Sequence, residues 1–114
     1  MPAKRVFVYG TLKKGYGNHA LLKDAQFIGE AVVKDHVLYG STIPFAVENE
    51  GTHITGEVYE IDDVTEINLD RLEGYPGWYG KKIVETGHGR AMMYYMKKHE
   101  VAGEPVIGSV FTNT

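Results

Sequence analysis

The sequence predicts an α+β domain built on a small, mixed, strongly curved or barrel-like sheet with short helices packed outside it. Short β-branched and aromatic runs recur along the chain, two helical segments interrupt them, and regular alternation of strand and helix is absent. The length of 114 residues fits one domain, residues 1–114, which is long enough to bury a single core.

The chain begins with a buried strand, a glycine-rich loop and a short helix. Arg5–Tyr9 is β-branched and aromatic, and Gly10 ends this strand. Residues 10–17 are expected to form a loop. Asn18 is a suitable N-cap for a helix of barely two turns over His19–Lys23.

The next stretch predicts three further strands. Ala25–Tyr39 alternates imperfectly, with Phe27 among the inward residues, and predicts two antiparallel strands that turn at Lys34–Asp35. Gly29 is expected to form a bulge or bend within it. A short strand over residues 45–47 follows Pro44, which confines it to an edge or a loop.

The second half predicts a clear strand, the best helix and a hairpin. Residues 54–61 alternate cleanly, and Asp62 or Asp63 then caps a helix that ends at Gly74. Near one face of that helix lie Val64, Ile67 and Leu72. Strands over residues 79–86 and 91–97, joined by a tight turn at 87–89, predict a β-hairpin. In this last strand the inward residues are expected to pack in the core, or to line a cavity.

Composition excludes several classes of protein. There is no cysteine, so disulfides, cysteine-ligated metal sites and thiol nucleophiles are excluded, and a cytoplasmic location is expected. Twelve basic and fifteen acidic residues are interleaved, which does not favour a nucleic-acid partner. The first apolar run is too short for a signal peptide or a membrane span. The five histidines lack metal-ligand spacing, so we expect no metal and no cofactor.

The glycine turn after the first strand has three interpretations. Gly10 to Gly15 follows the start of the phosphate-binding pattern of nucleotide hydrolases, but Tyr16 and Gly17 stand where that chemistry needs Lys and Ser or Thr. The turn could instead be only a connection between strand and helix. A third hypothesis is that its backbone N–H groups bind a carboxylate or a developing oxyanion.

Glu73 is a candidate general acid/base. It is predicted to end the second helix, where the helix dipole disfavours a carboxylate, and it directly precedes an aromatic turn. Both the dipole and desolvation by aromatic rings would raise its pKa toward neutrality, which suits proton transfer. The alternative is a surface glutamate that simply ends a helix.

Together the two stretches resemble the γ-glutamylcyclotransferase-like family, and most closely its γ-glutamylamine cyclotransferase branch. The resemblance rests on Tyr9-Gly10-Thr11-Leu12 with Lys13, Gly15, Asn18 and His19 after it, on Gly56-Glu57-Val58-Tyr59, and on Glu73 with Tyr79 six residues later. It covers residues 5 to about 97. It implies a small barrel in which the Tyr-Gly-Thr-Leu loop faces one glutamate across a cavity.

The resemblance also implies an activity and a set of site residues. A γ-glutamyl amine or amino acid would cyclise to 5-oxoproline by attack of its own α-amine, and the free amine would leave. Glu73 would be the catalytic acid/base, and the substrate would be bound by Tyr9, Gly10, Thr11, Leu12, Tyr79 and Lys81. A non-catalytic binding module of the same fold is the alternative. His19 is expected to support the loop rather than to catalyse.

Two departures from the family pattern affect these expectations. Family members often carry arginine where this chain has Lys81, and lysine lacks the planar fork that binds a carboxylate. The chain is also short after residue 97, so a segment that closes the pocket from the C-terminal side is expected to be reduced or missing. Tyr75 and Trp78 are either exposed turn residues or the rim of the pocket.

Overall fold

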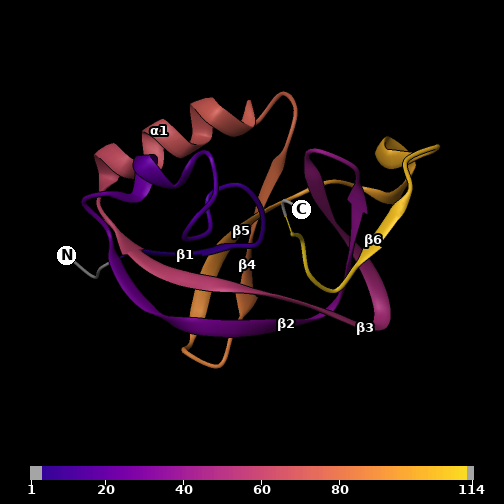
Figure 1. Cartoon of the computed structure of the whole chain (residues 1–114), viewed down its shortest axis with the longest axis horizontal. Helices are drawn as coiled ribbons and strands as arrows, with labels where there is room; N and C mark the ends of the chain where they lie inside the picture. The colour runs from indigo at the N-terminus through magenta and orange to yellow at the C-terminus, as the bar shows by residue number, and fades with distance from the viewer. Residues whose placement is uncertain (1–3, 113–114) are drawn as a thin grey trace.

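The computed structural model describes residues 4–112 and confirms the predicted fold class. A six-stranded mixed sheet curls into a half-barrel, and an α-helix packs against it (Figure 1). In chain order the elements are β1 (Lys4–Val8), η1 (His19–Leu22), β2 (Gln26–Gly40), β3 (Pro44–Ile61), α1 (Asp63–Glu73), β4 (Gly80–Glu85), β5 (Arg90–Tyr95), η2 (Lys98–Val101) and β6 (Val106–Gly108). None of the helices within residues 4–112 is long and apolar enough to cross a membrane.

Strand β1 lies in the interior of the sheet, whose order is β4-β5-β1-β3-β2-β6. Val6 pairs with Tyr59 of β3 in antiparallel register and with Met92 of β5 in parallel register. The loop that follows β1 therefore leaves from a strand that is paired on both sides, which gives residues 9–12 a fixed starting point.

Alternate residues of β1 enter two different hydrophobic clusters, because successive side chains of a strand point to opposite faces. Val6 and Val8 pack in one cluster with Leu69 of α1. Phe7, and Tyr9 directly after the strand, pack in the other. Both faces of β1 are thus buried, as its continuous apolar sequence predicts.

Strands β2 and β3 are longer than predicted. The sequence predicts a turn at Lys34–Asp35, but β2 runs on through it. The chain accommodates Asp35, whose φ is 63°, as an irregularity in the register with β3. The two strands predicted over residues 45–47 and 54–61 are likewise parts of one strand, β3. Gly29 lies at a second irregularity, as expected.

The ends of helix α1 are predicted correctly, but its buried face is not. The Asp62 side chain accepts a hydrogen bond of 2.7 Å from the amide of Thr65, and Gly74 ends the helix with a φ of 63°. Thr65 and Leu69 are buried, whereas the expected apolar residues Val64 and Ile67 are exposed. This rotation brings the acidic side of the helix to β4, where a lysine pairs with two of its carboxylates.

Two other expectations are wrong. Phe27 is half-exposed and its ring meets that of Tyr59 in a T-shaped contact. It lies outside the core because it precedes the irregularity that resets the alternation of side chains along β2. Asn18 does not cap the helix over residues 19–22, which is a 3-10 helix. Its side-chain amide instead donates a hydrogen bond of 2.8 Å to the Thr11 hydroxyl.

Candidate active site

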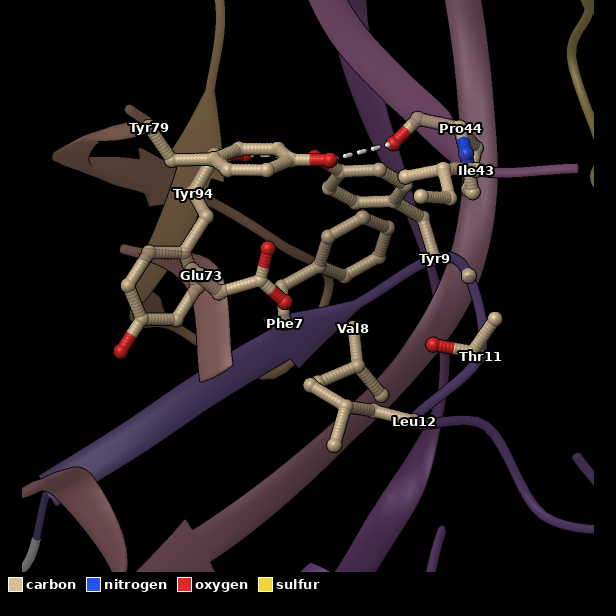
Figure 2. A pocket seen from close by; sticks show the side chains of 11 residues that line it. Phe7, Val8, Tyr9, Thr11, Leu12, Ile43, Pro44, Glu73, Tyr79 and Tyr94 are labelled. Atoms are coloured by element: carbon tan, nitrogen blue, oxygen red, sulfur yellow. Dashed lines mark hydrogen bonds between the residues drawn. The ribbon is translucent and has the colours of Figure 1, made fainter. Parts of the chain in front are cut away.

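A small cavity of about 50 Å³ lies where the loop after β1 meets the end of α1 (Figure 2). Its other walls come from the start of β3 and from the aromatic side chains around β4 and β5. The residues that line it are Phe7, Val8, Tyr9, Gly10, Thr11, Leu12, Ile43, Pro44, Glu73, Tyr79 and Tyr94. Segments that are far apart in the sequence thus converge on one site.

The loop over residues 9–12 is fixed by its neighbours and leaves backbone donors free. The amide of Lys13 donates to the carbonyl of Gly10 at 3.1 Å, and the amide of Asn18 donates to the carbonyl of Thr11 at 2.9 Å. Within residues 4–112 the N–H groups of Thr11 and Leu12 meet no acceptor. Thr11 and Leu12 both line the cavity, so their amides are the candidates there to bind an anionic group.

His19 supports this loop, as expected. Its Nδ1 atom lies 2.9 Å from the carbonyl oxygen of Leu12, so the imidazole is tied to the backbone of the loop. The loop lysine is engaged away from the cavity. The Lys13 ammonium is buried and donates a hydrogen bond of 2.7 Å to the carbonyl of Phe111, and Lys13 is absent from the cavity lining.

Tyr9 and Tyr79 form a wall whose hydroxyl groups are already engaged. The Tyr9 hydroxyl donates to the carbonyl of Tyr94 at 2.8 Å and accepts from the amide of Ala46 at 3.3 Å. The Tyr79 hydroxyl donates to the carbonyl of Pro44 at 3.1 Å. Burial raises the pKa of both phenols, so they stay protonated and keep donating. What these tyrosines offer the cavity is ring surface and a fixed position for the start of β3.

Glu73 places its carboxyl group in the cavity. It is the last residue of α1 and is half-buried, and Figure 2 shows the carboxyl pointing toward the rings of Phe7, Tyr9 and Tyr79. Burial raises the pKa of Glu73 from its ordinary value of 4.5 to about 7. The C-terminal end of the helix dipole acts in the same direction. A carboxyl group with this pKa can both accept and donate a proton near neutral pH.

The structure brings six of the seven predicted site residues together. Glu73, Tyr79 and the four loop residues all line the cavity. Lys81 does not. Its ammonium lies 2.7 Å from Glu66 and 3.0 Å from Asp70, because the acidic side of α1 faces β4 and draws the lysine away from the cavity.

Sequence reasoning missed five contributors to the cavity, namely Phe7, Val8, Ile43, Pro44 and Tyr94. Tyr94 could have been predicted, because it lies on a strand whose inward residues were expected to pack in the core or to line a cavity. Apart from the proline itself, no pattern at residues 43 and 44 indicated that they would line a cavity. Trp78 is absent from the cavity lining and packs on Tyr79 with a ring-centroid separation of 4.9 Å. The described residues hold no cluster of three or more side chains that could ligate a metal ion.

The comparisons with known proteins all point to one family. A family profile for gamma-glutamyl cyclotransferase, AIG2-like proteins matches residues 6–110. A Methanocaldococcus jannaschii protein, named provisionally as a gamma-glutamylcyclotransferase, is 49% identical over 82 residues, which make up 69% of this chain and 68% of that protein. The gamma-glutamylcyclotransferase family protein YtfP of Escherichia coli is 37% identical over 95 residues, 82% of this chain and 83% of the relative.

Solved structures agree with this assignment. The solution structure of YtfP matches with a TM-score of 0.74 and 35% identity, over 92% of each chain. The crystal structure of an AIG2-like protein from Mus musculus matches with a TM-score of 0.85 over all of this chain and 92% of that one, at 24% identity, which supports the fold. The profile spans the strands, the loop and the helix that build the cavity, and the relatives carry the same family name, so the chain belongs to the gamma-glutamyl cyclotransferase, AIG2-like family.

Proposed function

We propose that the protein is a γ-glutamyl cyclotransferase that acts on a γ-glutamyl amine or γ-glutamyl amino acid and releases 5-oxoproline and the free amine. One observation carries the proposal. A carboxyl group whose pKa is raised to about 7, that of Glu73, shares a cavity with the unpaired amides of Thr11 and Leu12. The family of the chain supports the same chemistry.

The reaction needs a proton carrier rather than a nucleophilic side chain. The substrate's α-amine attacks its own γ-carbonyl, so the new C–N bond closes a five-membered ring and the bond to the departing amine breaks. The α-ammonium group, with a pKa of about 8 by analogy with a peptide terminus, first loses a proton. That first proton goes to solvent. As the freed amine attacks, its nitrogen must lose a second proton to become the amide N–H of the ring, and Glu73 accepts this one and then donates it to the departing nitrogen, acting as base and acid in turn.

The protein also holds the conformer that closes the ring. The nucleophile is tethered to the electrophile, so positioning supplies much of the rate enhancement. The rings of Tyr9 and Tyr79 bound the space, and the amides of the loop bind either the substrate's α-carboxylate or the oxyanion of the tetrahedral intermediate. No lysine or arginine lines the cavity, so the backbone is the source of positive potential there.

The proposed partner is a free small molecule with a γ-glutamyl group, and neither nucleic acid nor a membrane takes part. Proton transfer by a single carboxyl group requires no cofactor. A cysteine-free chain suits the reducing cytoplasm, where we place the reaction.

The test is 5-oxoproline release from a panel of γ-glutamyl amines and γ-glutamyl amino acids. We expect the wild-type protein to turn over at least one member, and Glu73→Gln to lose at least about a hundredfold in kcat, the range of a lost general acid/base. Glu85→Gln is the matched control, because Glu85 lies on the surface of β4. A folded wild-type protein that binds γ-glutamyl compounds without turnover would instead identify a non-catalytic binding module.

A further inference from the structure

A chain of charged groups runs from β4 across helix α1 to the cavity wall. The Lys81 ammonium lies 2.7 Å from Glu66 and 3.0 Å from Asp70 of α1, and its side chain is only 15% exposed. Lys4 of β1 shares Glu66 at 2.6 Å. Asp70 in turn accepts a hydrogen bond of 2.6 Å from the Tyr94 hydroxyl. The same carboxylate therefore receives both the lysine and a residue of the cavity.

Tyr94 is held at both ends. Its backbone carbonyl accepts a hydrogen bond of 2.8 Å from the Tyr9 hydroxyl, and its own hydroxyl donates to Asp70. Figure 2 shows the ring beside Glu73 with the hydroxyl pointing away from the cavity. The ring thus presents a face to the cavity while its polar end is anchored outside it.

The ion pairs give this anchor its rigidity. Lys81 and Glu66 are mostly buried and Asp70 is 26% exposed, so breaking the pairs leaves partly desolvated charges. The Lys81 ammonium also lies 4.4 Å from the centre of the Tyr75 ring, and Tyr75 packs edge-on against Tyr94. Lys81 therefore links helix α1, Tyr75 in the turn after this helix, and the cavity wall formed by Tyr94.

We propose that Lys81 and Asp70 are positioning residues that hold the ring of Tyr94 as the wall of the cavity beside Glu73. This inference rests on the proposed function, in which Glu73 carries the proton. It assigns to Lys81 a role in place of the substrate contact expected from the sequence. The lysine acts on the reaction through Asp70 and Tyr94 without touching the substrate.

The consequence concerns the water around Glu73. The titratable side chains around its carboxyl are those of Tyr9 just after β1, Tyr79 from the turn before β4 and Tyr94 from β5, and Asp70 lies one turn earlier on α1. Of the three rings, only that of Tyr94 is tied to a charged side chain. Releasing it admits water to Glu73, weakens the burial that raises the pKa of this carboxyl, and moves that pKa down.

The experiment follows the ionisation of Glu73 directly, by NMR titration of its 13C-labelled side-chain carboxyl, beside the pH profile of kcat. We expect Tyr94→Phe and Asp70→Ala each to lower the pKa of Glu73 by about one unit, and the double variant to lower it no further than either single change. The matched control is Tyr95→Phe on the next residue of β5, which should titrate as the wild type does.

Lys81 is tested by rescue. Lys81→Met should lower the pKa of Glu73, and Lys81→Arg, which keeps the ion pairs with both carboxylates, should restore it. A merely structural role would lower the unfolding midpoint of these variants while the titration of folded Glu73 stayed in place, and that result would overturn the proposal. A wild-type protein that forms no 5-oxoproline would reject the proposed function alone, because the titration does not depend on turnover.

Discussion

Gly10 lies so close to Pro44 that a methyl group on its Cα would stand 2.6 Å from the Cγ atom of the proline ring. Such an approach is shorter than van der Waals contact, so residue 10 has room for no side chain. The contact joins the binding loop to the first residue of β3, and both residues line the cavity. Glycine is required here for proximity, because its φ does not lie in the left-handed region.

We expect Gly10→Ala to separate the loop from the start of β3. The clash should cost about 1–3 kcal/mol in the free energy of unfolding, the range of overpacking in a core, and lower kcat/KM at least about tenfold through misplaced loop amides. Gly17→Ala is the control, because no atom beyond its two chain neighbours lies within 4 Å of a methyl group built there. Denaturant unfolding and the 5-oxoproline assay measure the two effects. Equal behaviour of the two variants would contradict the prediction.

Tyr79 anchors the other side of Pro44 through its hydroxyl, and Tyr79→Phe should loosen that contact. The variant leaves the carbonyl of Pro44 without its buried partner, which costs about 1–3 kcal/mol in the free energy of unfolding. Tyr39→Phe removes a hydroxyl that bonds to no other group within residues 4–112, and its stability should stay within about 0.5 kcal/mol of the wild type. A crystal structure of Tyr79→Phe with residues 43–44 unmoved and unchanged stability would refute this account.

Most of the candidate site could be predicted from the sequence because its parts are short and local. The loop over residues 9–12 follows a buried strand, and Glu73 directly precedes the glycine that ends α1, so both carry clear local signals. Tyr94 and Pro44 enter the site through the curl of the sheet, which no local pattern encodes. The position of Lys81 depends on which face of α1 lies toward β4, a long-range arrangement that local periodicity does not encode.

The same division applies to the fold. Strand and helix types were predicted correctly wherever periodicity was strong. The lengths of β2 and β3 were not, since Asp35 and Gly51 adopt positive φ inside continuous strands and look like turns in the sequence. A β-bulge can hold a residue with positive φ inside a strand when the neighbouring strand is long enough to form hydrogen bonds on both sides of the bulge.

The C-terminal tail contacts the residues that directly follow the binding loop over residues 9–12. Phe111 is 3% exposed, and its carbonyl accepts hydrogen bonds from the Lys13 ammonium at 2.7 Å and from the Tyr16 hydroxyl at 3.3 Å. We expect Phe111→Ala to destabilise the protein by about 3–5 kcal/mol, as for other buried phenylalanines. Val110→Ala should cost less than about 0.5 kcal/mol, because that side chain is half-exposed. Urea unfolding of both variants makes the comparison, and similar losses would show that the tail is not docked.

Glu73 makes the stability of the protein depend on pH in an unusual direction. Its pKa is 4.5 in the unfolded chain and about 7 in the fold, so folding favours the protonated carboxyl. The stabilising contribution is fully present below pH 4.5 and is lost as the pH rises through 7. Ionising the carboxyl in its cavity should cost about 2 to 3 kcal/mol in the free energy of unfolding by pH 8.5.

The variant Glu73→Gln isolates this effect, because the amide resembles the neutral acid and does not ionise. Relative to the wild type, it should gain about 2 to 3 kcal/mol in the free energy of unfolding between pH 4.5 and pH 8.5. The gain should be centred between these limits, while Glu85→Gln on the exposed surface changes little with pH. Urea unfolding across that range provides the measurement. A difference between Glu73→Gln and wild type that does not vary with pH would mean that Glu73 ionises as an ordinary solvated carboxyl, and it would remove the physical basis for its role as the proton carrier.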